Sequence, residues 1–316
     1  MAAGKVIAVV GATGAQGGGL VRAILADPSR EFAVRAITRD PGSGKARELE
    51  RLGAEVVAAD LHDPASVARA FAGAHGAYCV TFFWAHFSPE QEMAEARAMA
   101  EAAAAAGLEH VVWSTLEDSR RYVPLDDPRM PTLMGRYKVP HFDAKGESDQ
   151  FFRDARVPTT FLLTSFYWDN FIHFGAGPQR LADGRLALVL PIADAPLPGI
   201  AAEDIGRCAL GLFKAGPRFI GRTVGIAGEH LTGAQMAEKL ARALGQPVGY
   251  QAVPPAVYRG LGFPGAEDLG NMFQFNAEFA DAFCAARPVA LARELNPALQ
   301  TLDDWLATNA PGIPLP

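Results

Sequence analysis

The sequence predicts an α/β fold in which a doubly wound parallel sheet is followed by a smaller, less regular α/β domain. Three observations lead to this prediction. The chain has 316 residues, enough for about two domains at roughly 150 residues each. Apolar strand patterns alternate with helical patterns up to about residue 115, an order typical of parallel sheets. The pattern then loosens, so we expect a first domain of residues 1–165 and a second of residues 166–316, with a soft boundary that the chain can cross again.

Short runs rich in Val and Ile, ending at glycine or polar residues, indicate the strands. They are expected at residues 5–10, 33–38, 55–58, 77–82, 110–114 and 159–163. Apolar residues at helical spacing indicate helices at residues 14–26, 42–53, 64–72, 89–106 and 140–156, and later near 202–214 and 232–243. Residues 116–139 carry three prolines and little periodicity, which predicts a long loop of the kind usually tied to function or to a lid.

The clearest helix, residues 89–106, has signals at both ends. Ser88 is its expected N-cap, Pro89 occupies the first position, and Gln91 would complete a capping box. Gly107 is expected to end it. Its many alanines are small enough for close helix packing, so a homodimer interface is one use that we expect for it.

Composition excludes several classes of protein. Hydrophobic residues make up 49% and charged residues 20% of the chain, which excludes a mostly disordered protein. The net charge of −6, without a block of like charges, argues against nucleic-acid binding through a basic surface. The three cysteines lie far apart, which excludes a disulfide framework and a thiolate zinc site. No other metal site, signal peptide or membrane span is expected, and a reducing, cytoplasmic setting fits best.

Three glycines directly follow the first predicted strand. The segment VIAVVGATGAQGG places Gly11, Gly14 and Gly17 where the first helix begins, which is the strand–turn–helix context of a dinucleotide site. Gly11 permits the turn, Gly14 lets the backbone approach a pyrophosphate, and Gly17 allows close helix–strand packing. The N–H groups at the start of the helix would bind the anion. The alternative is a glycine-rich turn that serves packing alone.

The end of the second predicted strand indicates which dinucleotide would bind. Arg39 stands about twenty residues beyond the glycine turn, where the ribose 2′ group should lie. A guanidinium pairs with a 2′-phosphate, whereas a carboxylate would repel it, so Arg39 favours NADP(H) over NAD(H), with help from Lys45. Asp40 is the counter-evidence, but its position before Pro41 is better explained by a turn.

The G-x-x-G-x-x-G spacing resembles the short-chain dehydrogenase/reductase superfamily, in its extended or atypical branch. That superfamily uses a Ser–Tyr–Lys set in which tyrosine and lysine are one helical turn apart. Ser114 and Thr115 stand in the serine region, and Lys145 has the place of the lysine, but His141 stands four positions before it. Tyr137 precedes Pro140 and is expected outside the helix. The catalytic tyrosine is therefore absent.

Three longer segments make the resemblance more specific. HFDAKGESDQFFRDARVPTTFLLTSFYWDNF, LGFPGAEDLGNMFQF and LNPALQTLDDWL resemble the NmrA-like family of atypical short-chain dehydrogenases/reductases. The resemblance implies a Rossmann-type domain that holds NADP(H) in the glycine turn, and a smaller C-terminal domain that forms the far wall of a cleft. The family holds redox-sensing regulators as well as reductases, among them quinone reductases and azoreductases that work without flavin.

The resemblance, together with the position of each strand end, implies a set of site residues. Residues expected to bind the cofactor are Gly11, Thr13, Gly14, Gln16, Gly17, Arg39, Lys45, Asp60, Leu61, Thr81, Phe82, Ser114, Lys145 and Phe166. Residues expected to line the substrate pocket are Trp84, His86, Tyr167, Trp168 and Asn170. The candidate catalytic residues are Lys145 and His141.

Several of these assignments have a structural alternative. Asp60 could cap the helix that starts at Pro64, although Asp63 is the better cap. Lys145 could be an ordinary solvated lysine, and His141 could simply start its helix. The aromatic residues among them could pack in a core.

Two functions remain open from the sequence. In the first, hydride passes from NADPH to an electron-poor acceptor, quinone-like or azo-type, because such acceptors give a stabilised anion and do not need a tyrosine as strong acid. The substrate would be small, flat and aromatic. In the second, the protein is a non-catalytic NADP(H) sensor that acts through a regulatory protein partner, and the 116–139 loop orders when cofactor binds.

Overall fold

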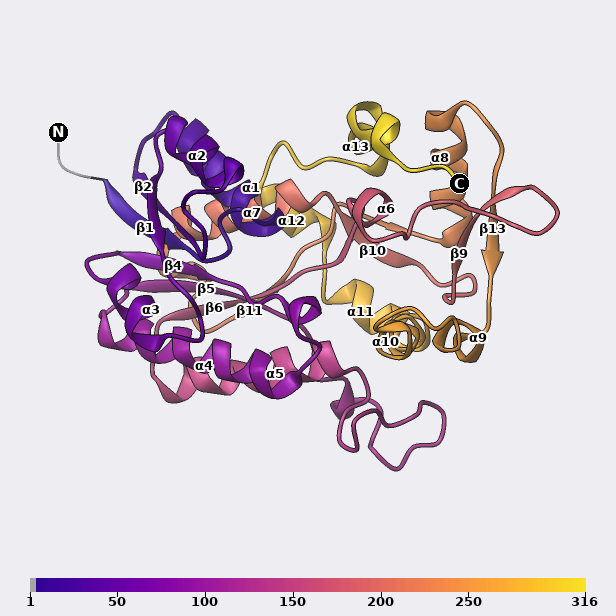
Figure 1. Cartoon of the computed structure of the whole chain (residues 1–316), viewed down its shortest axis with the longest axis horizontal. Coiled ribbons are helices and arrows are strands. Elements are labelled where there is room, and N and C mark those ends of the chain that lie inside the picture. The colour runs from indigo at the N-terminus through magenta and orange to yellow at the C-terminus, as the bar shows by residue number, and fades with distance from the viewer. Residues whose placement is uncertain (1–3) are drawn as a thin grey trace. The chain divides into compact units, whose positions relative to one another are not determined.

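The structure, a computed structural model, describes residues 4–316 and divides into two compact units (Figure 1). The first unit consists of residues up to 118, 144–164 and 203–224. The second consists of residues 119–143, 165–202 and 225–316. The chain thus passes between the units several times, and a domain boundary at residue 165 stays a prediction.

A seven-stranded sheet with the order β11-β6-β5-β4-β1-β2-β3 forms the centre of the first unit. Every neighbouring pair from β6 to β3 is parallel. The strands are β1 Lys5–Val9, β2 Phe32–Thr38, β3 Glu55–Ala58, β4 Gly76–Cys79, β5 His110–Thr115, β6 Thr159–Leu163 and β11 Thr223–Gly225. The chain winds outward from β1 in both directions, so the crevice beside β1 is the topological switch point at which ligands bind in such sheets. The predicted fold class is confirmed.

Helices cover both faces of this sheet (Figure 1). They are α1 Ala15–Ala26, α2 Gly44–Arg51, α3 Pro64–Phe71, α4 Pro89–Ala105, α5 Pro140–Asp154 and α7 Ala202–Lys214, with 3₁₀ turns η1 Phe83–Ala85 and η3 Gly216–Phe219. In Figure 1, α3, α4 and α5 lie below the sheet, and α1 and α7 lie above it. One buried core lies between the sheet and the apolar sides of α3 and α4. Among the described residues, no helix is both long and apolar enough to span a membrane.

The start of α4 differs from the prediction in one detail. Ser88 accepts the Gln91 backbone N–H (3.2 Å), as an N-cap should. The Gln91 side chain does not bond back to Ser88 to close a capping box; its amide nitrogen lies 2.7 Å from His62 Nε2. The alanines of α4 that are buried, such as Ala96 and Ala103, lie in the core of the unit, so their size is explained without a dimer. A homodimer stays a prediction.

The second unit contains two three-stranded sheets, with the orders β12-β10-β7 and β13-β9-β8. Their strands are β7 Phe166–Tyr167, β8 Gln179–Arg180, β9 Leu186–Leu190, β10 Leu197–Ile200, β12 Glu229–Leu231 and β13 Val248–Ala252. The helices are α6 Asn170–His173, α8 Gly233–Leu244, α9 Pro255–Arg259, α10 Ala266–Glu278, α11 Ala280–Ala285, α12 Val289–Leu295 and α13 Leu302–Asn309, with 3₁₀ turns η2 Ser119–Arg121 and η4 Ala310–Gly312. A second apolar core lies among these elements.

The 116–139 segment is a loop, as expected, but the protein holds much of it in place. The buried Asp143 carboxylate accepts hydrogen bonds from the backbone N–H groups of Ser119 and Lys138 (2.8 Å each). The Asn271 side-chain amide donates to the carbonyls of Pro131 (2.9 Å) and Lys138 (2.5 Å). These bonds fix the loop at both ends and in the middle, which argues against its acting as a freely moving lid.

His110 gives the first unit a measurable pH dependence. Its Nε2 lies 2.9 Å from Thr160 Oγ1, and its ring packs edge-on to Phe213. Burial, helped by the nearby His75, lowers the pKa of His110 from 6.5 to about 4. Because the unfolded chain takes up this proton more readily, the stabilisation is present above pH 6.5 and is lost as the pH falls towards 4.

We therefore expect His110→Gln, which keeps a polar group for Thr160, to flatten this part of the stability profile. Between pH 7 and pH 4.5 the free energy of unfolding of the wild type should fall by about 2–3 kcal/mol more than that of the variant. This figure follows from the size of the pKa difference. Urea unfolding at the two pH values measures it, and the exposed His173→Gln is the control. Equal losses in the wild type and His110→Gln would contradict the assignment.

Candidate functional site

The turn after β1 has the geometry that its three glycines predict. Gly11 adopts φ +64°, which side-chain-bearing residues rarely do, and its carbonyl accepts the Gly14 N–H (2.8 Å). A Cβ atom on Gly17 would lie 2.5 Å from the Gly11 carbonyl oxygen. The N-terminus of α1 is capped by no side chain and carries no acidic residue in its first turn. The turn is therefore tight, and its helix terminus suits an anion.

Two predicted cofactor residues, Gln16 and Ser114, bond to one another. Gln16 Oε1 accepts hydrogen bonds from Ser114 Oγ (2.8 Å) and from the Tyr78 hydroxyl. These bonds tie the first turn of α1 to β4 and β5. Ser114 is buried, and its hydrogen bond orients Gln16. Thr13 is half-buried. Contact of Thr13, Gln16 and Ser114 with a cofactor stays a prediction.

The charged groups after β2 lie at the surface or in a turn. Arg39 and Lys45 are exposed. Asp40 Oδ1 accepts the Gly42 N–H (2.9 Å), and the Asp40 N–H donates to Thr38 Oγ1 (3.3 Å). The carboxylate is thus engaged in a turn, which confirms the alternative given for Asp40 and leaves the two cations at the surface.

Further residues that were predicted to bind the cofactor follow the ends of β3 and β4. Asp63 caps α3 by accepting the Ala65 N–H (3.1 Å), as expected. Asp60 instead accepts the His62 N–H (3.0 Å) and remains exposed, beside the half-buried Leu61. Phe82, just after β4, exposes 55% of its surface, and its contact with a cofactor stays a prediction.

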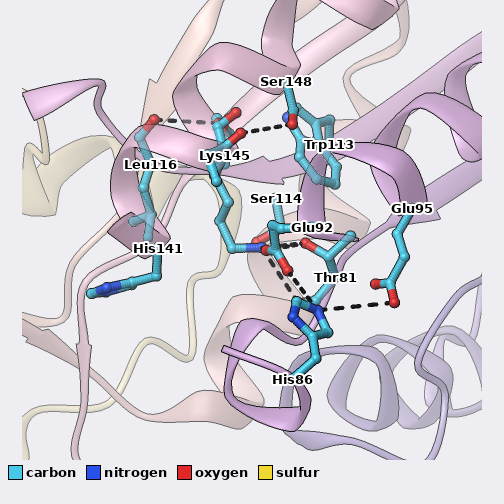
Figure 2. A network of polar contacts seen from close by, with 12 residues as sticks. Thr81, His86, Glu92, Glu95, Trp113, Ser114, Leu116, His141, Lys145 and Ser148 are labelled. Carbon is cyan, nitrogen blue, oxygen red and sulfur yellow. Dashed lines mark hydrogen bonds and ion pairs between the residues drawn. The ribbon is translucent and has the colours of Figure 1, made fainter. Parts of the chain in front are cut away.

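Lys145 is the centre of a buried polar cluster of the first unit (Figure 2). Its Nζ lies 2.7 Å from Glu92 Oε1 and donates to Thr81 Oγ1 (2.5 Å), while Thr81 Oγ1 donates to Glu92 Oε1 (2.5 Å). Nζ also lies 5.3 Å from the centre of the Trp113 ring. A lysine so enclosed is not a solvated surface lysine, and that alternative is wrong.

Glu92 was not predicted from the sequence. Its side chain is completely buried in α4. Burial alone would raise the pKa of Glu92. The charge of Lys145 and the hydrogen bonds that the Glu92 carboxylate accepts outweigh burial and hold this pKa at about 2. The helical spacing of the sequence could have revealed it. Glu92 and Glu95 lie on the same face of α4 as Ala96, Met99 and Ala103, and this face is buried.

His86, expected in the substrate pocket or over the core, turns towards this cluster instead. Its Nδ1 accepts the Ser88 N–H (3.0 Å), and its Nε2 lies 3.5 Å from Glu92 Oε2 and 4.0 Å from Glu95 Oε1. The ligand atoms of these three residues lie within 4.8 Å of one another. Because Glu92 is already paired with the Lys145 ammonium, we interpret the group as an ion-pair cluster, and the absence of a metal stays a prediction.

His141 lies on the same helix as Lys145 but has other partners. Its Nδ1 lies 2.6 Å from Asp268 Oδ1, and its backbone N–H donates to Asp268 Oδ2 (3.2 Å). Both side chains are buried in the second unit. This pair joins the start of α5 to α10, a structural use that the sequence did not reveal. A catalytic role for His141 stays a prediction.

The remaining predicted residues are Phe166, expected at the cofactor, and the aromatic and polar residues expected in the substrate pocket. Trp168 is only 1% exposed and packs in the core of the second unit, where a Cβ atom on Gly199 would lie 2.3 Å from its Nε1. This position fits core packing and not a pocket wall. Phe166, Tyr167 and Asn170 are half-buried in the second unit. The half-buried Trp84 of the first unit packs edge-on to Phe83 and Phe87.

Comparisons with known proteins agree with one another. The model of the NmrA-like family matches residues 3–306. An NmrA-like family domain-containing oxidoreductase, FrzB from Cladobotryum sp, is 28% identical over 304 residues, which cover 90% of this chain and 87% of the relative. The NAD(P)H azoreductase of Xenophilus azovorans is 29% identical over 249 residues, which cover 78% of this chain and 77% of the relative. The crystal structure of NmrA, a negative transcriptional regulator, in complex with NADP is 26% identical, covers 98% of this chain and 96% of that one, and has a TM-score of 0.79.

Proposed function

Because this chain belongs to the NmrA-like family, we propose that it is an NADP(H)-binding oxidoreductase that passes hydride from NADPH to a quinone-like or azo-type acceptor. The proposal is supported by relatives described as oxidoreductases and as an NAD(P)H azoreductase. It is also supported by the crystal structure of NmrA, which has a similar fold and is in complex with NADP. We propose a small, flat and aromatic substrate.

The residues of the first unit fit a bound dinucleotide. The Gly17 position has no room for a Cβ atom, the helix terminus that follows Gly14 is uncapped, and Arg39 is exposed at the end of β2. Gly11, Gly14 and Gly17 would hold the pyrophosphate, Arg39 and Lys45 the 2′-phosphate, and Asp60 the adenine side. Bound NADPH would supply the hydride.

The buried Lys145 is the observation that carries the reductase proposal. Glu92 and Thr81 hold its ammonium just beyond the end of β4, the strand beside β1 and its glycine turn. We propose that this ammonium binds the nicotinamide ribose, stabilises the negative charge that develops on the acceptor, and donates the proton. No tyrosine is needed for this role, because a reduced quinone is a weaker base than the alkoxide that forms from a ketone.

This proposal is tested by NADPH oxidation with menadione and with methyl red, using purified protein to which no flavin is added. Turnover with either acceptor, well above the rate without protein, is expected. NADPH binding without oxidation by any such acceptor would reject the proposal.

Arg39→Asp should change which cofactor is preferred. Loss of a charge-assisted bond to the 2′-phosphate costs about 1.5–3 kcal/mol, so the Kd for NADPH should rise about 10- to 150-fold relative to that for NADH. Fluorescence titration with both cofactors measures the ratio. Arg51→Asp, at an exposed arginine in the last turn of α2, is the control and should leave the ratio unchanged. Equal weakening of both cofactors by Arg39→Asp would show that Arg39 does not read the 2′-phosphate.

A non-catalytic NADP(H) sensor is the second candidate, because one relative is described as a negative transcriptional regulator and the position of the usual tyrosine is His141. It requires a change of shape or partner on cofactor binding. The bonds from Asp143 and Asn271 already hold the 116–139 loop, which weakens this reading. Limited proteolysis with and without NADPH tests it, and identical cleavage patterns would count against a sensor.

A further inference from the structure

We propose that Trp84 and Phe87 form an aromatic corner that holds the flat ring of the acceptor. The inference rests on the proposed reductase function and names residues that select its substrate. The sequence predicts Trp84 for the pocket but not Phe87, and both residues belong to the first unit.

The turn that carries the two rings is attached to the Lys145 cluster at both of its ends. Before the turn, Thr81 Oγ1 accepts a hydrogen bond from Lys145 Nζ (2.5 Å). Within its last residues, His86 Nε2 lies 3.5 Å from Glu92 Oε2, and the other oxygen of Glu92 lies 2.7 Å from Lys145 Nζ. Figure 2 shows Thr81 and His86 both turned towards Glu92. The turn therefore stands beside the ammonium at which we propose that the acceptor is reduced.

Phe87 has a backbone conformation that an aromatic residue rarely adopts. Its φ is +55°, in the left-handed region, where the Cβ atom is crowded by the following carbonyl oxygen. Within residues 4–316, the other non-glycine residues with positive φ are Arg30, Met134, Arg156 and Ala193, none of which is aromatic. Residues in such strained conformations are concentrated at functional sites.

The turn requires this backbone conformation but not the side chain. The Phe87 N–H donates to the Phe83 carbonyl (2.8 Å) and closes the 3₁₀ turn η1. The next residue, Ser88, donates its N–H to His86 Nδ1 (3.0 Å) and caps α4. Glycine is the usual residue at such a position, because it has no Cβ atom to crowd the backbone. The phenyl group therefore costs stability here, and a use for the ring in binding explains its presence.

The ring of Phe87 is placed for stacking. Phe87 exposes 37% of its surface, and its ring centre lies 5.7 Å from that of Trp84 at an interplanar angle of 73°. The buried Phe83 packs edge-on to both rings and holds them in place. In a corner of this kind, a flat aromatic molecule stacks on one ring and turns its edge to the other, and both geometries are favoured. The aromatic corner therefore selects acceptors with a flat ring system.

Three variants separate the ring from the fold. Phe87→Gly removes the ring and relieves the backbone, Phe87→Ala removes the ring only, and Phe87→Tyr keeps an aromatic ring. We expect kcat/KM for menadione to fall about 2- to 10-fold in the Gly and Ala variants, the size of one lost ring contact, and to stay near the wild-type value in Phe87→Tyr. The Kd for NADPH should not change. Phe87→Gly should unfold at a higher urea concentration than Phe87→Ala, so a loss of activity that both share does not come from stability.

Arg156→Gly is the matched control for the backbone. Arg156 is exposed, has φ +54°, and lies between the end of α5 and the start of β6, at the opposite edge of the parallel sheet. This variant should raise the urea concentration at which the protein unfolds and leave kcat/KM for menadione unchanged. Wild-type kcat/KM in both Phe87→Gly and Phe87→Ala would overturn the aromatic corner.

A binding measurement without turnover separates this inference from the proposed function. Methyl red is titrated into protein saturated with NADP⁺, which has no hydride to transfer. The Kd for the dye should rise about 2- to 10-fold in Phe87→Gly and stay unchanged in Phe87→Tyr. If the dye binds in this way but the wild type oxidises no NADPH, the proposed function fails and the aromatic corner stands. An equal Kd in wild type and Phe87→Gly, or no dye binding to the wild type, rejects the aromatic corner whatever the activity.

Discussion

Lys145→Met is expected to lower kcat for NADPH-dependent reduction by about 10²- to 10⁴-fold, the usual contribution of a positioned proton donor. The variant removes the ammonium that Glu92 and Thr81 hold but leaves the glycine turn and Arg39 untouched. NADPH should therefore still bind, with a moderately higher Kd from the lost ribose contact. Stopped-flow oxidation and fluorescence titration measure the two effects separately.

Folding of this variant requires its own control. Removing one partner of a buried ion pair costs about 3–5 kcal/mol, because Glu92 must then stay charged and unpaired or take up a proton. The double variant Lys145→Met, Glu92→Gln replaces both charges and should recover much of the stability without recovering kcat. Wild-type kcat in either variant would show that Lys145 is structural.

Gly17→Ala should weaken cofactor binding. Its Cβ atom would lie 2.5 Å from the Gly11 oxygen, 2.8 Å from the Gly11 carbonyl carbon and 2.9 Å from the Val10 oxygen. All three are backbone atoms, so the turn itself must open. Overpacking of this kind costs about 1–3 kcal/mol, which predicts a Kd for NADPH about 5- to 150-fold higher if the cost falls on the bound conformation.

Gly44→Ala is the matched control, because it places the same methyl group at the first residue of α2, where nothing lies within 4 Å of the new Cβ. Calorimetric titration with NADPH should detect little change there. If Gly17→Ala also binds NADPH like the wild type, the turn after β1 does not hold the pyrophosphate.

The sequence predicted most of the first unit because its signals are local. The glycines after β1, the cap at Asp63 and the turn at Asp40 each involve residues within a few positions of one another. Strand and helix periodicity likewise depends on near neighbours. These features could be assigned, and the structure has them where they were expected.

The site could be predicted less completely, because its contacts join distant parts of the chain. Lys145 meets Glu92 from another helix, and His141 meets Asp268 across 127 positions. No pattern in the sequence pairs such residues. Trp168 was expected in the pocket because it follows a strand end. It is instead buried, and it packs closely against glycines such as Gly199 that lie far along the chain. The helices α9 and α10 were not predicted, because proline and glycine interrupt the periodicity there.

Single-turnover oxidation of NADPH by flavin-free protein tests the central claim most directly. Protein in excess over NADPH would be mixed with methyl red in the absence of oxygen, using either ordinary NADPH or NADPH deuterated at the transferred position. The proposed hydride transfer predicts oxidation that requires both protein and acceptor and that is slower with the deuterated cofactor. Tight NADPH binding, with oxidation no faster than in the absence of protein, would contradict the claim and leave the sensor as the better account.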